Sequence, residues 1–178
     1  MKTPDTSLTA TPIVKSIWHT RPTLEQMNRP TPTMDATLGI QFTEVGDDFL
    51  RACMPVDHRT QQPMGLLHGG ASVALAETLG SAGAYLCVDA TLFNVVGLEI
   101  NCNHVRGVRS GVVTGTARPV HLGKSTHIWE IRIADEAGRL VAISRLTVAI
   151  LSKSTENNSQ NNKEHNKDTA TGKIPDAV

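Results

Sequence analysis

Alternation of apolar and polar residues with a period of two dominates the middle of the chain. Successive side chains of a strand point to opposite faces, so this pattern predicts half-buried strands that cover a core with one face. In the third of these segments, Val96 and Leu98 are expected on one face and Glu99 on the other. The six segments that show the pattern are residues 40–45, 49–56, 96–104, 111–121, 125–134 and 139–151.

One long apolar segment without this alternation separates the second predicted strand from the third. Residues 65–88 are rich in alanine and leucine, and they predict the single long helix of the chain. Because nearly the whole circumference of this helix is apolar, it must be covered on almost all sides. The expected fold is therefore α+β, with an antiparallel sheet of about six strands wrapped around one central helix.

The two ends of the chain differ in composition from the middle. Residues 1–37 carry many prolines, so this segment is expected to be mostly irregular, with one short helix that Thr23 caps. Residues 38–151 contain all the predicted strands and form the expected domain. Residues 152–178 are rich in Asn, Lys, Ser and Thr and are expected to be a disordered tail.

Overall charge and cysteine content exclude several classes of protein. Lys plus Arg and Asp plus Glu both number 17, so neither nucleic acid nor an anionic membrane is an expected partner. No run of 18 apolar residues and no signal peptide are visible. The three cysteines form no CxxC pair, which favours reduced thiols and a cytoplasmic location. The seven histidines lack the spacing of metal motifs, so neither a metal nor a cofactor is expected.

Glu77 is the one charged residue of the predicted helix. A carboxylate among apolar neighbours is costly and its pKa tends to rise, which makes Glu77 a candidate functional group. The alternative is that Glu77 points to water or pairs with an arginine of the sheet. Ser81 follows at i+4 and shares a helix face with Glu77, although a small residue there could also serve close packing.

His68, Gly69 and Gly70 stand at the expected start of the same helix. Glycine lets a ligand approach the backbone closely, and the free N–H groups of a helix start stabilise negative charge. A carbonyl group becomes an oxyanion when it is attacked, so this segment is a candidate oxyanion site. The alternative is an ordinary glycine-rich loop that leads into a helix.

Residues 61–81, QQPMGLLHGGASVALAETLGS, resemble the signature of the hotdog thioesterases related to enzymes of the phenylacetate pathway. Shorter matches are VVGLEIN at residues 95–101, NHVR at 103–106 and HLG at 121–123. The resemblance extends over about residues 17–151. It implies a hotdog fold, thioester hydrolysis, and a dimer with active sites at its interface, usually within a homotetramer.

The resemblance also implies which residues form the site. Glu77 would act as nucleophile or general base, and the Gly69 N–H would polarise the thioester carbonyl. In such dimers Glu77 of one subunit faces Gln62, His68 and Gly69 of the other. The remaining implied catalytic residue is Ser81. The residues expected to hold CoA are Gly97, His104, Val105, Arg106, Gly107, His121, Leu122, Gly123, Lys124, Ser125 and Thr126.

The expected function is hydrolysis of an aromatic acyl-CoA to the free acid and CoA. The resemblance favours 1,4-dihydroxy-2-naphthoyl-CoA of menaquinone biosynthesis as the substrate. The nearest alternative is a proofreading thioesterase that removes misloaded aryl groups from an acyl carrier protein. Two further alternatives are a hotdog dehydratase and a non-catalytic acyl-CoA-binding module. A buried Glu77 argues against the binding module, since binding alone gives little use for a costly carboxylate.

Overall fold

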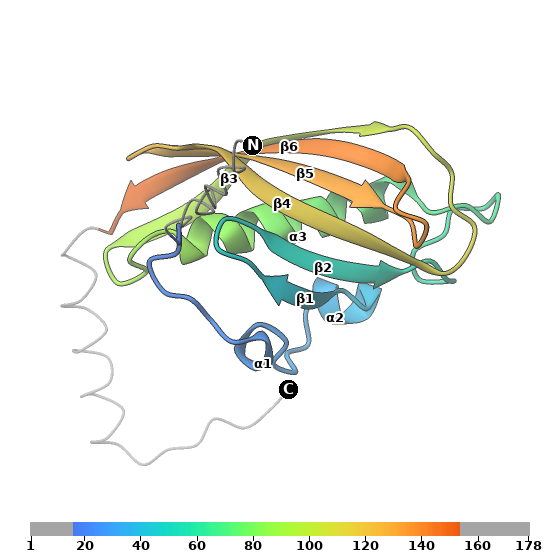
Figure 1. Ribbon diagram of the computed structural model, residues 1–178, viewed down its shortest axis with the longest axis horizontal. Helices are drawn as coiled ribbons and strands as arrows, with labels where there is room; N and C mark the ends of the chain where they lie inside the picture. Colours follow the sequence, from blue (N-terminus) through green and yellow to red (C-terminus); the bar gives the residue numbers. More distant parts are fainter. Residues whose placement is uncertain (1–15, 154–178) are drawn as a thin grey trace, which may run out of the picture.

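The computed structural model describes residues 16–153 (Figure 1). Most of the predicted tail, residues 154–178, lies outside the described residues, as do residues 1–15. The helices and strands follow the order α1 (Leu24–Met27), α2 (Met34–Leu38), β1 (Gln41–Val45), β2 (Leu50–Pro55), α3 (Gly69–Leu86), β3 (Phe93–His104), β4 (Val112–Leu122), β5 (Thr126–Ala134) and β6 (Leu140–Ser152).

The six strands form one antiparallel sheet in the order β1-β2-β4-β5-β6-β3, and α3 packs against one face of it (Figure 1). This confirms the predicted sheet around one long helix. β1 and β3 are the edge strands. β3 is the longer edge, with 12 residues that pair on one side with β6. Among residues 16–153 no strand pairs with its other side, which is therefore a template for pairing with another strand.

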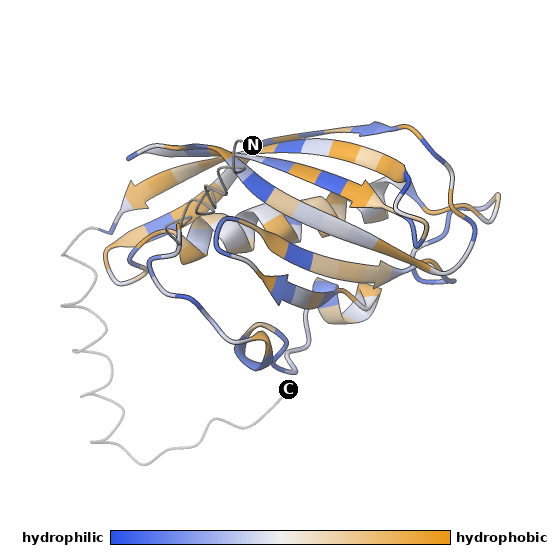
Figure 2. Cartoon of the chain, viewed as in Figure 1, coloured by the Kyte–Doolittle hydropathy of each residue, from blue (hydrophilic) through white to orange (hydrophobic). Residues whose placement is uncertain are grey.

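Packing between α3 and the sheet accounts for the core. Trp129, Ile131 and Ile133 alternate along β5 and are fully buried, as are Leu75 and Leu79 of α3. Apolar and polar residues alternate along the strands as the sequence pattern predicted (Figure 2). Apolar burial is the main favourable term in folding, so this helix-to-sheet layer fixes where the functional side chains lie.

One prediction for β3 was wrong. The pairing of β3 with β6 shifts between Gly97 and Glu99, so Leu98 is an extra residue in a β-bulge. Val96 pairs with Ala149 and Glu99 pairs with Thr147, so both lie on the sheet face away from α3. Val96 and Leu98 therefore do not share the inner face, and the two residues are 45% and 62% exposed.

The N-terminal segment contains two short helices rather than the one predicted. α1 has the expected cap, since the Thr23 side chain accepts a hydrogen bond from Gln26 N. α2 is the additional helix, and it ends at Gly39, whose φ of 72° is in the left-handed region that favours glycine. The Thr78 hydroxyl of α3 donates to Asp35 of α2 at 2.7 Å, which ties the segment to the central helix.

Candidate active site

Helix α3 begins with one free backbone donor. His68 is its N-cap, and His68 Nδ1 accepts a hydrogen bond from Gly70 N at 2.8 Å. The His68 carbonyl accepts from the N–H groups of Ala71 and Ser72 at 3.0 and 3.2 Å. Of the first four N–H groups, only that of Gly69 has no acceptor among the described residues. A free N–H at the positive end of a helix is suited to hold a developing negative charge.

A cavity of about 410 Å³ opens beside this helix start. Its size is in the range of small-molecule sites. It joins the loop before α3 and the first turn of α3 with two segments that are distant in the sequence, the end of β3 and the start of β6. Six residues of the predicted site line it, together with four others: Gln62, Gly69, His104, Val105, Arg106 and Gly107, with Leu66, Leu67, Ser72 and Val141.

Within this cavity, the His104 ring packs against Gly69. A Cβ built on Gly69 would lie 2.8 Å from His104 Nε2, so only glycine leaves room for the ring here. The other ring nitrogen, Nδ1, is 3.8 Å from Cys102 Sγ. Cys102 was not among the predicted site residues. Its position two residues before His104, on the same face of a strand, was the available signal.

Arg106 stands at the exposed rim of the same cavity. Among the described residues, its hydrogen bond is from Nε to the Leu140 carbonyl at 3.4 Å, and it forms no ion pair. The end of the guanidinium is therefore free to bind an anion. A guanidinium binds phosphate through two parallel N–H groups, so this position suits a phosphate of a ligand in the cavity.

Glu77 belongs to a second cluster, farther along α3. The Ser81 hydroxyl donates to Glu77 Oε1 at 2.7 Å, as their i+4 spacing predicted. A Cβ built on Gly97 of β3 would lie 3.1 Å from the same oxygen. The half-buried carboxylate therefore points at the edge strand. In the described part of the chain Glu77 has no arginine partner, so the alternative of a structural ion pair is wrong there.

The two clusters of one chain cannot act on the same bond. Gly69 and Glu77 are eight residues apart on one helix, which corresponds to roughly 12 Å at 1.5 Å per residue. A general base must lie within about 3 Å of the proton that it removes, and an oxyanion donor must lie equally close to its oxygen. One chain therefore carries two half-sites rather than one complete site.

The turn between β4 and β5 forms a third group. Leu122, Gly123 and Lys124 line a cavity of about 640 Å³ together with the residues that directly follow α3 and the start of β3. Phe93 begins β3 at this end of the sheet, and His104 ends β3 at the other. At about 3.3 Å per residue, the strand between them spans more than 30 Å. One chain thus does not bring this turn together with the cavity around His104.

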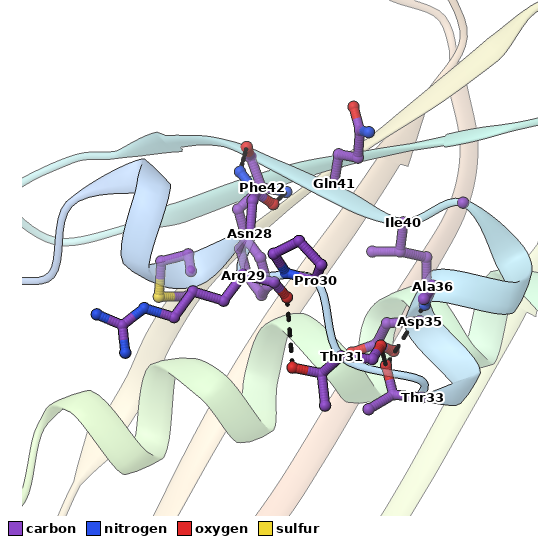
Figure 3. A pocket seen from close by; sticks show the side chains of 12 residues that line it. Asn28, Arg29, Pro30, Thr31, Thr33, Asp35, Ala36, Ile40, Gln41 and Phe42 are labelled. Carbon is purple, nitrogen blue, oxygen red and sulfur yellow. Dashed lines mark hydrogen bonds between the residues drawn. The ribbon is translucent and has the colours of Figure 1, made fainter.

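Another cavity, of about 420 Å³, lies between α1, α2 and β1 (Figure 3). The Asn28 side chain pairs with the backbone of Phe42 much as a neighbouring strand would. Its amide group donates to the Phe42 carbonyl and accepts from Phe42 N, both at 2.8 Å. None of the predicted site residues lines it. The cavity lies where the N-terminal segment packs on β1.

No group of His, Cys, Asp and Glu in residues 16–153 has the arrangement of a metal site. Across the same residues, every helix is too short or too polar to cross a membrane.

Comparisons with known proteins agree with this fold. Residues 64–142 match the thioesterase superfamily. The 1,4-dihydroxy-2-naphthoyl-CoA hydrolase of Escherichia coli is 54% identical over 136 residues, which cover 76% of this chain and 99% of that protein. The proofreading thioesterase EntH of Cronobacter sakazakii is 53% identical over 137 residues, 76% of this chain and 98% of that one.

A crystal structure of a mutant thioesterase from Pseudomonas aeruginosa superposes with a TM-score of 0.76 at 51% identity, covering 78% of this chain and all of that one. The chain belongs to the thioesterase superfamily and has the hotdog fold. It is a thioester hydrolase, as the resemblance implied. This excludes the hotdog dehydratase and the non-catalytic binding module as its main activity.

Proposed function

We propose that the protein hydrolyses an aromatic acyl-CoA, with 1,4-dihydroxy-2-naphthoyl-CoA of menaquinone biosynthesis as its substrate, in the cytoplasm. The observation that carries the proposal is the free Gly69 N–H in one cavity with Gln62 and Arg106, on a chain whose carboxylate Glu77 faces an unpaired edge strand. The name of the E. coli relative supports this choice of substrate. A hydrolysis screen across aryl and alkyl CoA thioesters tests it, and a preference for short alkyl groups would contradict it.

The complete site forms between two copies of the chain. Pairing of two β3 edges about a two-fold axis satisfies their free backbone groups and covers the exposed Val96 and Leu98. A strand that pairs with its own copy is antiparallel to it. Gly97 lies beside the Glu77 carboxylate. To bring Gly97 opposite the partner subunit's His104, the axis must pass near residues 100 and 101. Glu77 then faces the Gly69 and Gln62 half-site of the other copy.

The same pairing explains why one chain keeps its two groups of expected CoA-binding residues, 104–107 and 121–126, far apart. It carries the Phe93 end of one β3 toward the His104 end of the other. The 121–126 turn of one chain and the 104–107 segment of its partner therefore lie at the same end of the dimer. Arg106 and Lys124 from different chains can then bind phosphates of one CoA. A dimer of such dimers, the expected homotetramer, leaves this arrangement intact.

The chemistry follows from the positions of these groups. The thioester oxygen accepts a hydrogen bond from the Gly69 N–H while Gln62 and His68 orient the carbonyl. Glu77 either removes a proton from a water that attacks the carbonyl carbon, or attacks that carbon to form an anhydride that water then hydrolyses. The C–S bond breaks in both routes, and CoA leaves as a thiolate that takes up a proton. Ser81 donates to Glu77 Oε1 and holds the carboxylate in place.

The second candidate is removal of misloaded aryl groups from a carrier protein, and the Cronobacter relative is named a proofreading thioesterase. Both substrates end in the same phosphopantetheine arm, but only CoA carries a nucleotide with further phosphates. The uncommitted guanidinium of Arg106 at the cavity rim favours CoA. Comparing kcat/KM for the same aryl group on CoA and on a carrier protein separates the two functions.

Arg106→Ala is expected to raise KM for acyl-CoA by roughly tenfold or more and to change kcat less than about twofold. A hydrogen bond to a charged group contributes about 1.5–3 kcal/mol, and a phosphate contact is equal in the ground and transition states. Steady-state kinetics measures the split. Arg132→Ala, which removes an exposed guanidinium of β5, is the matched control. A large fall in kcat at unchanged KM would contradict a CoA-binding role.

A further inference from the structure

The His104 ring is held between two groups, one at each nitrogen. Nε2 faces Gly69, where a Cβ would be 2.8 Å away, and Nδ1 is 3.8 Å from Cys102 Sγ. Cys102 and His104 pair with Ser144 and Ala142 of β6, both buried, so both side chains lie on the sheet face toward α3. A sulfur–nitrogen distance of this size is that of a weak hydrogen bond involving a thiol.

The chemistry of the thiol decides which ring nitrogen carries the proton. Burial raises the pKa of Cys102, and the neighbouring Ser144 side chain only partly opposes this, so the sulfur keeps its hydrogen. The Ser144 hydroxyl proton is not available to the Cys102 sulfur, because it is donated to the Asn101 carbonyl at 2.5 Å. In a neutral imidazole one nitrogen donates and the other accepts, and the partner of one nitrogen fixes the role of the other.

We propose that Cys102 is a positioning residue for His104. Its S–H donates to Nδ1, and the ring proton therefore resides on Nε2, directed at the space beside Gly69. The thioester oxygen then meets two donors, the Gly69 N–H and the His104 Nε2–H, as a two-donor oxyanion hole. This inference rests on the proposed role of Gly69 in polarising the carbonyl, and it names Cys102 as the residue that sets the tautomer.

Cys102→Ala is expected to lower kcat by roughly threefold to tenfold, the size expected for loss of one weak hydrogen bond that orients a donor, with KM changed less than about twofold. In a His104→Ala background the same change should have no further effect on kcat, because the residue acts only through the ring. Cys53→Ala removes a half-buried thiol of β2 outside the site and is the matched control, expected to leave kcat unchanged.

Nitrogen NMR of the full-length protein labelled with ¹⁵N-histidine reports which ring nitrogen of His104 carries the proton. This tautomer would not change if Cys102 only packed against the ring. The His104 signals, assigned by their loss in His104→Ala, should show a protonated Nε2 in the wild type and a mixture of tautomers in Cys102→Ala. This measurement remains decisive even if Cys102→Ala lowers the melting temperature.

Four results would overturn the inference. They are an Nδ1-protonated ring in the wild type, an equal loss of kcat from Cys102→Ala with and without His104, normal turnover in Cys102→Ala, and full activity in His104→Ala. None of these results touches the role of Glu77. Failure of the proposed function itself would appear separately, as a Glu77→Gln variant that still turns over.

Discussion

Glu77→Gln is expected to lower kcat by roughly 10²- to 10⁴-fold, the range for loss of a general base, while acyl-CoA still binds. The amide has nearly the shape of the carboxylate, and its oxygen can still accept the hydrogen bond from Ser81. It has neither the basicity nor the nucleophilicity that attack on a thioester requires. Steady-state kinetics together with binding of a non-hydrolysable acyl-CoA analogue measures both expectations.

The control for this change is Glu25→Gln, which neutralises an exposed carboxylate in the first turn of α1. It should leave kcat and KM within about twofold of the wild type, since surface substitutions away from functional features have small effects. Near-normal turnover by Glu77→Gln would remove Glu77 from the chemistry and would leave the second half-site without a function.

Gly97→Val is expected to lower kcat by about 10²-fold without unfolding the protein. A Cβ at residue 97 would already lie 3.1 Å from Glu77 Oε1, so the branched side chain must displace the carboxylate. A displacement of about 1 Å at a reacting group can reduce the rate by this factor. Gly97 is exposed on an edge strand, so the substitution overpacks no core.

A graded series makes the Gly97 test sharper. Gly97→Ala, which adds one methyl group at a tight but tolerable distance, should have a smaller effect than Gly97→Val. The melting temperatures of both variants should stay within a few degrees of the wild type. If Gly97→Val were as active as the wild type, the carboxylate would not work in the position that the structure gives it.

Local patterns of apolar and polar residues predicted much of the fold. The strand alternation and the apolar run at residues 65–88 predicted a sheet and a helix, and α3 occupies Gly69–Leu86. The bulge at Leu98 was not predictable in this way, because an extra residue is defined by the pairing of β3 with β6 and not by its own sequence. Leu98 is apolar and fits the alternation, yet the pairing leaves its side chain mostly exposed.

In the site, too, contacts within one helix were predictable from the sequence, whereas contacts between distant segments were not. Helical spacing was enough to predict that Ser81 lies beside Glu77. The contacts of Gly97 with Glu77 and of His104 with Gly69 join β3 to α3, and only the folded chain reveals them. Cys102 resembled an ordinary core thiol, and its spacing of two residues from His104 was the one local sign that its sulfur lies near a ring nitrogen.

The central claim is that each active site combines Glu77 of one chain with Gln62 and Gly69 of another. Mixing two inactive variants tests it most directly. One is Glu77→Gln, and the other combines Gln62→Ala with Gly69→Val, in which the new side chain collides with His104. The two are given different affinity tags, refolded together, and the mixed dimers are purified with both tags.

A mixed dimer then holds one intact site and one doubly altered site, by the symmetry of a two-fold interface. The expected result is about half the kcat of the wild-type dimer per mole of mixed dimer, with almost none in either parent. Each chain of a mixed dimer carries one defect, so sites built within single chains would all remain inactive. Mixed dimers without activity would contradict the shared site.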